Sequence, residues 1–475
     1  MWLHTIKDPL EESFVTNTGP RIEQDSMGEV RVPADALWGA QTQRAIDNFN
    51  ISGRAMPKAF VHALARIKGT AARVNHALGL LDAERADAIA RAAAEVMAGE
   101  HDDQFPVDVY QTGSGTSSNM NVNEVLAHRG GLISGLEISP NDHVNLGQSS
   151  NDVVPATLHL AAALTIRARL QPAWQDMLAI IEARSTELAE VIKTGRTHLM
   201  DAMPLTLGQE MSAWAAQAAD LNDRITGIEP RLGRLALGGT AIGTGINTHP
   251  EFGTRVATAL AADTGYPFTA DPNAFRAIAS QDTAAELSGI LRTGALTLTK
   301  IANDLRWMNS GPLAGLGEIE LEALQPGSSI MPGKVNPVLP EAVAMAAARI
   351  IGLDASISVA AGSGNFQLNV MLPLIADSLL ESVGLLAGAA DATARAVRGF
   401  QVRTDQIEGP LARNPILVTA LNPVIGYLDA ARIAKRAYQE GRPILEVALE
   451  MTELSREELE SLLDPMRLTR GGIGS

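Results

Sequence analysis

The sequence contains no cysteine in 475 residues, which excludes a disulfide framework, a thiolate nucleophile and a cysteine-ligated metal. Aromatic residues are also few, at 4% of the chain, although 46% of the residues are hydrophobic. The apolar content is therefore mostly aliphatic, which suits closely packed helices better than aromatic-rich sheets. Because the chain is longer than one core usually serves, we expect two or three domains, or one elongated domain completed by oligomerisation.

Positive charge is scarce: 38 Lys and Arg face 54 Asp and Glu, for a net charge of −16. This balance argues against a partner such as nucleic acid or an anionic membrane, although a local cationic pocket is compatible with it. We expect no stretch to span a bilayer. Residues 1–20 form a polar extension without the apolar core of a secretory signal, and their acidic residues do not fit a transit peptide. These features predict a cytoplasmic protein.

A stretch rich in glycine, serine and proline at residues 327–337, GSSIMPGKVNP, interrupts two strongly helical regions. Pro337 suits the first position of a following helix. Backbone N–H groups in a tight turn beside Lys334 would favour a carboxylate or a phosphate. A phosphate-binding P-loop does not fit, because five residues separate the two glycines instead of four, and Val335 follows the lysine instead of Ser or Thr. A flexible surface connection would not explain why Ser, Lys and Asn crowd into so short a span.

Two other polar clusters each stand at a predicted helix start, at residues 111–124 and 140–152. There the free N–H groups and the helix dipole favour an anion. Either cluster alone could be an N-cap in a solvated turn, but the repetition of one device suggests a shared site. The candidate ligands are Ser114, Gly115, Thr116, Asn119, Ser149, Ser150 and Asn151.

Hydrophobic periodicity predicts a largely helical chain. Apolar stripes such as Leu287, Leu291 and Leu298 indicate a bundle seam. The predicted elements are a hairpin within 21–32, two helices between 57 and 98, and long helices at about 154–194, 205–233, 276–309, 338–361 and 366–396. The expected domains are 1–148, mostly helical with the hairpin near its start, 149–404, a long-helix bundle carrying the loop, and 405–475, a small proline-punctuated helical lobe.

One histidine stands in a setting that could be catalytic. The segment 195–204, GRTHLMDAMP, places His198 in a polar turn that we expect between two helices. A lone histidine is more often structural, so the residues alone leave its role open.

These motifs carry a family resemblance. Residues 327–337 resemble the signature loop of the fumarase/aspartase superfamily, whose members release fumarate from a succinyl-type substrate or reverse that addition. The resemblance extends from about Arg21 to the C-terminal helices and is strongest to the class II fumarate hydratases. It implies a mainly α, three-domain fold whose central bundle assembles into a homotetramer, with each active site shared by three subunits. It also implies a lyase of the citric acid cycle that uses no cofactor or metal.

The resemblance assigns roles to matching residues. Ser328 resembles the base that takes the C3 proton of the substrate, and His198 with Glu341 resembles the pair that handles water. Aspartate ammonia-lyases typically have glutamine at the histidine position, so His198 favours hydration of fumarate. The substrate carboxylates would meet the two polar clusters and the residues Thr197, Ser329, Lys334, Val335 and Asn336.

The chain departs from the family at a second carboxylate site. Where many members have His-Pro-Asn-Asp, this sequence has Ser139, Pro140, Asn141 and Asp142, and His143 follows, a variation also found among aspartases. An aspartate ammonia-lyase, or a hydratase of a substituted fumarate, is therefore the alternative. A catalytically silent helical scaffold would not need the intact loop and histidine.

Overall fold

The computed structural model describes residues 19–472, so the polar extension predicted at the N-terminus lies almost wholly outside the described residues. The fold is mainly helical, as predicted. The chain divides into two compact units. Unit 1 comprises the described residues up to Ala161 together with Gly233–Gln281 and Ala360–Asp377, and unit 2 comprises Ala162–Leu232, Asp282–Val359 and the chain from Ser378 onward.

Unit 1 begins with the predicted hairpin, in which Arg21 pairs with Val32 in antiparallel register. The two helices predicted between residues 57 and 98 are also present, and they pack so closely that a Cβ on Gly69 would lie 2.9 Å from the Cβ of Ala93. The first elements are β1 (Arg21–Asp25), β2 (Gly28–Val32), α1 (Ala40–Asn48), α2 (Lys58–Ala77), α3 (Ala83–Met97), η1 (Asp102–Gln104) and α4 (Thr116–Ser134).

The rest of unit 1 brings later segments against these helices. A π-helical turn precedes α5, and two short strands pair in parallel, with Arg234 opposite Thr269. The elements are η2 (Pro140–Val144), the first part of α5 (Ser150–Thr165), β5 (Arg234–Leu235), α8 (Phe252–Thr264), β6 (Thr269–Ala270) and α9 (Ala274–Ala279).

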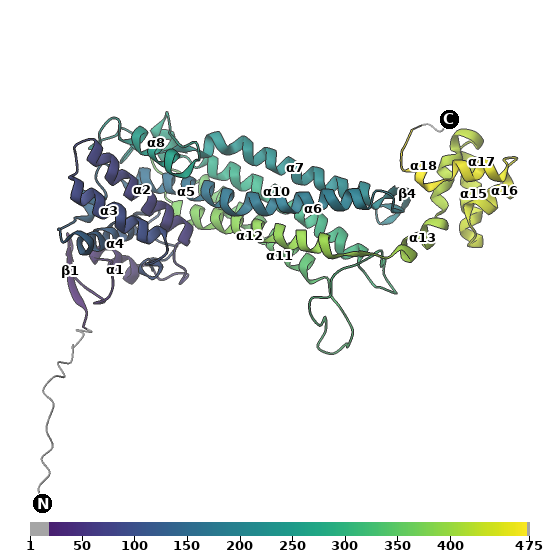
Figure 1. Cartoon of the computed structure of the whole chain (residues 1–475), viewed down its shortest axis with the longest axis horizontal. Coiled ribbons are helices and arrows are strands. Elements are labelled where there is room, and N and C mark those ends of the chain that lie inside the picture. The colour runs from purple at the N-terminus through teal and green to yellow at the C-terminus, as the bar shows by residue number, and fades with distance from the viewer. Residues whose placement is uncertain (1–18, 473–475) are drawn as a thin grey trace, which may run out of the picture. The chain divides into compact units, whose positions relative to one another are not determined.

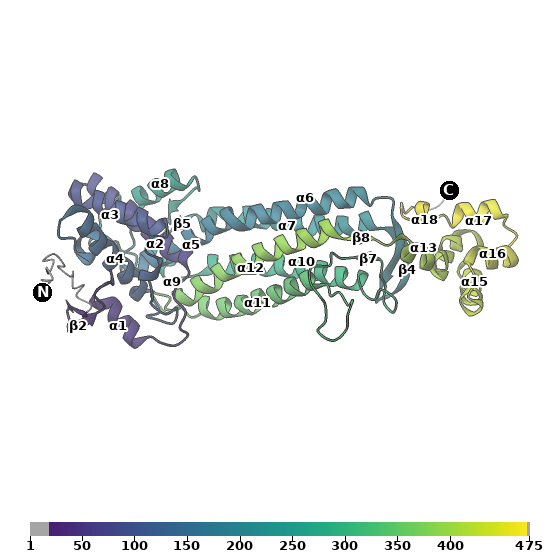
Figure 2. The same ribbon diagram turned by 60° about the horizontal axis from the view of Figure 1, so that its bottom comes forward.

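Unit 2 is built on long helices that run side by side in both views (Figures 1 and 2). Leu287, Leu291 and Leu298 are fully buried, as the predicted seam requires. A Cβ on Gly294 would lie 2.8 Å from the Leu221 side chain, so α7 and α10 are in close contact. The helices are η3 (Ile166–Leu170), α6 (Gln171–Glu187), α7 (Leu207–Leu232), α10 (Asp282–Met308), α11 (Val338–Ala361) and α12 (Leu372–Gly399).

A hairpin replaces the ends of two predicted helices. Strand β3 (Ile192–Thr197) pairs antiparallel with β4 (Met200–Thr206), and His198 lies in the turn that joins them. The predicted turn is therefore present, but two strands flank it directly, which the prediction missed. The hairpin escaped prediction because a bulge between Thr194 and Arg196 interrupts the alternation of its short strands.

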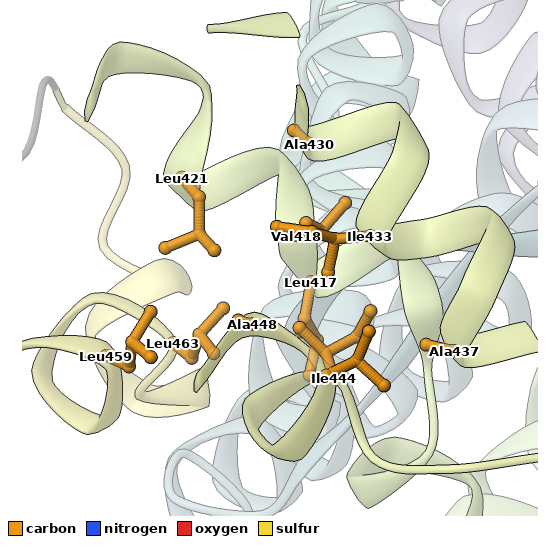
Figure 3. Packing of buried hydrophobic residues seen from close by; sticks show 11 residues of the cluster. Leu417, Val418, Leu421, Ala430, Ile433, Ala437, Ile444, Ala448, Leu459 and Leu463 are labelled. Atoms are coloured by element: carbon orange, nitrogen blue, oxygen red, sulfur yellow. The ribbon is translucent and has the colours of Figure 1, made fainter. Parts of the chain in front are cut away.

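The C-terminal part of unit 2 has short helices with their own apolar cluster. Leu417, Leu421, Ile433, Val447 and Leu459 are among its buried members, and Figure 3 shows most of them converging from several helices. The elements are β7 (Ile319–Glu320), β8 (Gln401–Val402), α13 (Thr404–Ala412), η4 (Pro415–Leu421), α14 (Asn422–Ile425), α15 (Tyr427–Glu440), α16 (Ile444–Met451), α17 (Arg456–Leu462) and α18 (Pro465–Leu468).

The expectation that no stretch could span a bilayer is wrong, because some helices are long and apolar enough to do so when length and composition alone are considered. In the part of the chain that the structure describes, three helical stretches reach that length and hydropathy: Ser150–Glu187, Val338–Ala361 and Leu372–Gly399. Long bundle helices have this composition because neighbouring helices cover their apolar faces. In the first and third, 67% and 72% of the most apolar window is buried within the chain, whereas in α11 only 33% is buried. An apolar face of α11 is therefore left uncovered by the rest of residues 19–472.

Candidate active site

The loop at residues 327–337 lies between β7 and α11 in the sequence. It belongs to the green segment that projects from the helical bundle in Figure 1. Its base is closed by two hydrogen bonds: Gly327 N–H donates to the Lys334 carbonyl at 2.8 Å, and Asn336 Nδ2 donates to the Gly327 carbonyl at 2.5 Å. A Cβ at position 327 would lie 2.3 Å from the Lys334 carbonyl oxygen. Only glycine fits here.

Within this loop, Ser328 is held by the backbone that follows it. Its Oγ accepts hydrogen bonds from the N–H groups of Ile330, at 3.2 Å, and Met331, at 3.0 Å. Two amide donors aimed at one oxygen would stabilise negative charge on it. A serine hydroxyl is a poor base unless its alkoxide is stabilised in this way.

Several predicted residues at the end of the loop line one hollow of about 470 Å³. Lys334 and Arg306 bring positive charge to this hollow, and Glu341 brings a carboxylate. A hollow of this size with two cations suits a small organic acid. The lining residues that were predicted are Lys334, Val335, Asn336 and Glu341, and the others are Asn303, Arg306, Trp307, Asn309, Ser310, Gly311 and Pro337.

His198 occupies a strained position. It and Leu199 form the two-residue tip of the hairpin with φ of 56° and 61°, a left-handed pair that glycine or asparagine usually supplies. Non-glycine residues held there cost on the order of 1 kcal/mol each, which marks a position fixed for a reason other than local stability. The His198 side chain is exposed and makes no hydrogen bond or ion pair with Glu341 within residues 19–472. The implied histidine and glutamate pair is therefore not formed inside one chain.

A buried ion network anchors the hairpin that carries His198. The Lys193 side chain, 2% exposed, lies 2.7 Å from carboxylate oxygens of both Glu210 and Glu318. Arg196 lies 2.6 Å from the other oxygen of Glu318. Two cations of β3 thus form ion pairs with one buried carboxylate, and these ion pairs fix the position of β3, which ends at Thr197. This role could not be predicted from the local sequence, because it depends on Glu318, which comes from a distant part of the chain.

The two polar clusters of unit 1 meet, as their repetition suggested. Asn119 Nδ2, on α4, donates to Ser150 Oγ at 3.1 Å, at the start of α5. Nearby, Ser114 Oγ and Thr116 Oγ1 lie 2.8 Å apart at the start of α4, beside Gly115. The hydroxyl and amide groups of both clusters are therefore gathered at neighbouring helix starts, where N–H groups favour an anion.

Part of the second cluster has structural duties. The carboxylate of Asp152, fully buried, accepts from the N–H groups of Ser149, Gly238 and Thr240 at 2.9, 3.1 and 2.9 Å. The side-chain amide of Asn151 donates to the Ala241 carbonyl at 2.8 Å. This part of the cluster binds the glycine-rich loop at residues 238–245. Burial is the main influence on Asp152, and it raises the pKa of that carboxyl to about 6.

At the position of the predicted second carboxylate site, the polar groups already satisfy each other. Ser139 Oγ donates to Asp142 Oδ2 at 2.8 Å and accepts from Asp142 N–H at 3.1 Å. Pro140 and Asn141 line a separate hollow of about 520 Å³, which also contains Arg21 and His128. Burial lowers the pKa of His128, so its imidazole adds little charge. The serine that replaces the family's histidine thus caps the turn.

Among residues 19–472, the one group of carboxylates and histidines spaced as metal ligands is Glu95, Glu100 and His101. Arg129 binds both carboxylate oxygens of Glu95, at 2.5 and 3.0 Å, and this ion pair is the largest cause that lowers the Glu95 pKa to about 2. The guanidinium already occupies the position that a cation would take.

Comparison with known proteins agrees with this architecture. A family model described as Lyase matches residues 28–352, and a model described as Fumarase C C-terminus matches residues 417–470. The solved class II fumarase of Schistosoma mansoni superposes with a TM-score of 0.92 at 38% identity, covering 95% of this chain and 99% of that one. The matches define a lyase of the fumarase/aspartase superfamily.

Closer relatives narrow the assignment. The class II fumarate hydratase of Xylella fastidiosa is 60% identical over 454 residues, which is 95% of this chain and 96% of the relative. A second class II fumarate hydratase, from Pseudomonas aeruginosa, is 57% identical over 457 residues, covering 96% of this chain and 100% of the relative. The chain therefore belongs to the class II fumarate hydratase family.

Proposed function

We propose that this protein is a fumarate hydratase, which adds water reversibly and in anti geometry to fumarate and gives (S)-malate. The observation that carries the proposal is the high identity to class II fumarate hydratases along nearly the whole chain, combined with an intact signature loop. In a cell this reaction is a step of the citric acid cycle, and we place the enzyme in the cytoplasm.

In the dehydration direction, Ser328 is the proposed base. Its alkoxide takes the C3 proton of malate, and the electron pair of that C–H bond moves into the adjacent carboxylate, giving a doubly negative aci-carboxylate. The two amides at Ser328 Oγ support this role because they stabilise the oxyanion before the proton is taken. Lys334, Asn336, Ser329 and Thr197 are the proposed donors to the carboxylate on which charge develops.

His198 is proposed to deliver the proton with which the C2 hydroxyl leaves as water, and in hydration to take that proton back. Glu341 would orient and polarise its imidazole. Because His198 is exposed and unpaired with Glu341 in its own chain, this role requires a second copy of the chain to bring the two side chains together.

A homotetramer is the proposed assembly, with each site taking residues from three subunits. The uncovered apolar face of α11 supports it, since Met345 and Val359 are each 69% exposed in the single chain. Exposed apolar patches of this kind on a bundle helix mark interaction surfaces. The division into domains at residues 148 and 404 remains part of this proposal.

The alternative is a related lyase that uses ammonia or a substituted fumarate, and the changes at Ser139 and His143 keep it open. Purified protein is incubated with fumarate, with and without ammonia, and the products are identified by NMR. Malate formed without ammonia is the expected result. Aspartate as the sole product would replace the proposal with an ammonia-lyase, and no turnover of any dicarboxylate would refute it.

A further inference from the structure

A lysine that no step of the proposed reaction uses lies beneath the polar clusters of unit 1. The side chain of Lys68, on α2, is completely buried. Its Nζ donates to Asn145 Oδ1 at 2.8 Å. Buried lysines are rare unless they are paired with a carboxylate, because an ammonium loses its hydration in the interior. Lys68 makes this hydrogen bond to a neutral amide instead.

Asn145 connects this lysine to the candidate substrate ligands. Its Oδ1 accepts three hydrogen bonds, from Lys68 Nζ, from Asn119 Nδ2 at 3.2 Å and from Asn123 Nδ2 at 3.2 Å. The same Asn119 Nδ2 donates to Ser150 Oγ. Lys68 therefore lies two hydrogen bonds from Asn119 and three from Ser150.

The orientation of the Asn119 amide depends on this chain of contacts. Its Oδ1 is buried and has no hydrogen-bond partner within the described residues. The hydrogen bonds from Asn119 Nδ2 to Asn145 and Ser150 are therefore the contacts that select this orientation over the one in which Nδ2 and Oδ1 are exchanged. Two contacts fix Asn145 with its oxygen toward both asparagines: the ammonium of Lys68, which can only donate, binds Oδ1, and Nδ2 donates to the Gln148 carbonyl at 3.1 Å.

Charge supplies the second argument. Burial lowers the pKa of Lys68 to about 7, and the carboxylate of Asp152, on α5, is the charged group that opposes this shift. Asp152 has its own three backbone donors, so it attracts Lys68 through space without a direct bond. An anion bound at Asn119 and Ser150 would add a second negative charge near the ammonium and would hold it protonated.

We propose that Lys68 is a positioning residue for the substrate carboxylate, which acts through Asn145 to orient Asn119 and Ser150 and supplies positive charge behind them. This inference rests on the proposed function, because it takes the ligand of these clusters to be the carboxylate of a small diacid. Lys68 itself touches no substrate. Its contribution is to binding more than to the chemical step.

The test compares Lys68→Met with Lys58→Met in the full-length protein. Lys58 lies on the same helix with a side chain that is 74% exposed, so it is a control for the same substitution outside the network. Two measurements are made: kcat and KM for fumarate and malate from pH 6 to pH 9, and succinate binding by titration calorimetry. Thermal unfolding midpoints report on folding.

Removal of a charge-assisted hydrogen bond from the network should weaken binding by about tenfold or more. We expect Lys68→Met to raise KM and the succinate Kd by that factor, to change kcat much less, and to remain folded, with an unfolding midpoint near that of the wild type at pH 7. The wild-type KM should rise above pH 7, where Lys68 loses its proton, and the variant should lack this rise. Lys58→Met should behave as wild type.

An unchanged KM and succinate affinity in Lys68→Met would overturn the inference, as would a loss of kcat alone. Should that variant not fold, Lys68→Gln keeps an amide donor toward Asn145 while it removes the charge, and an unchanged succinate Kd in that variant would overturn the inference. If the wild type binds succinate but does not hydrate fumarate, the proposed function is refuted. The succinate affinities of the wild type and Lys68→Met then still test the role of Lys68 in binding. Absence of any dicarboxylate binding in the wild type refutes both.

Discussion

Replacing Gly327 by alanine should disable the loop that carries Ser328 and leave the rest of the fold intact. A Cβ at this position would lie 2.3 Å from the Lys334 carbonyl oxygen and 2.9 Å from the backbone nitrogen of Asn336. Both atoms belong to the backbone, so no side-chain rotation can relieve the overlap. The base of the loop must open.

Opening the base breaks two hydrogen bonds, from Gly327 N–H to Lys334 and from Asn336 Nδ2 to Gly327. At about 1 kcal/mol each, the local penalty is roughly 2 kcal/mol. The effect on turnover is larger if Ser328 Oγ loses one of its two amide donors, because a missing oxyanion donor reduces kcat by about 10²- to 10³-fold. The unfolding midpoint should stay near that of the wild type, since Ile330 in this loop is 83% exposed and contributes little to the core.

The assay is the loss of the ultraviolet absorbance of fumarate, from which initial rates give kcat and KM. Gly333→Ala is the matched control, because Gly333 has φ of +82° but no atom within 4 Å of an added Cβ. An alanine in that conformation costs about 1–2 kcal/mol, so its kcat should fall by less than about thirtyfold. A Gly327→Ala enzyme with nearly wild-type kcat would refute the reasoning, and equal losses in the two variants would show that the overlap is not the cause.

Three other outcomes are expected. Ser328→Ala should abolish hydration without changing the assembly measured by light scattering, and a near-normal rate would remove Ser328 from the role of base. His198→Gln should lower malate formation by about 10²-fold or more, and unchanged malate production would contradict its assignment. Because burial lowers the pKa of Lys68 from 10.5 to about 7, the native state lacks a proton that the unfolded chain keeps between these values. The free energy of unfolding should therefore rise with pH across this window, by more in the wild type than in Lys68→Met, and identical slopes in denaturant titrations would argue against it.

The long helices could be predicted because their apolar stripes repeat over many turns. The range 338–361 matches α11 at both ends, and Leu287, Leu291 and Leu298 are buried as their spacing requires. The β3–β4 hairpin could not be predicted, since a bulge interrupts the alternation of its two short strands. The hairpin is anchored by ion pairs from Lys193 and Arg196 to Glu318, which comes from a distant part of the same sequence, so local patterns do not indicate it.

The candidate site divides in a similar way. The meeting of Asn119 with Ser150 followed from two similar clusters at two helix starts. Lys68 gave no such signal, because a lysine in an alanine-rich helix resembles a solvated one unless the burial of its helix face is known. The Asn336 amide was assigned to the substrate, but one of its donors closes the base of the loop, a contact that depends on how the loop folds back.

The exposed apolar residues of the single chain bear on how the site is completed. Ile330 is 83% exposed and Met331 is 50% exposed, and both belong to the loop whose amides hold Ser328. On α11, the helix that this loop enters, Met345 is 69% exposed. Burial of these apolar side chains away from water lowers the free energy. A second copy of the chain that covers α11 and the loop would therefore favour the ordered loop over an open one. His198 is exposed at a strained hairpin tip and lacks Glu341 within its chain. In the proposed tetramer, the association that buries this apolar surface would also bring a carboxylate to His198, which would couple assembly to the formation of the active sites.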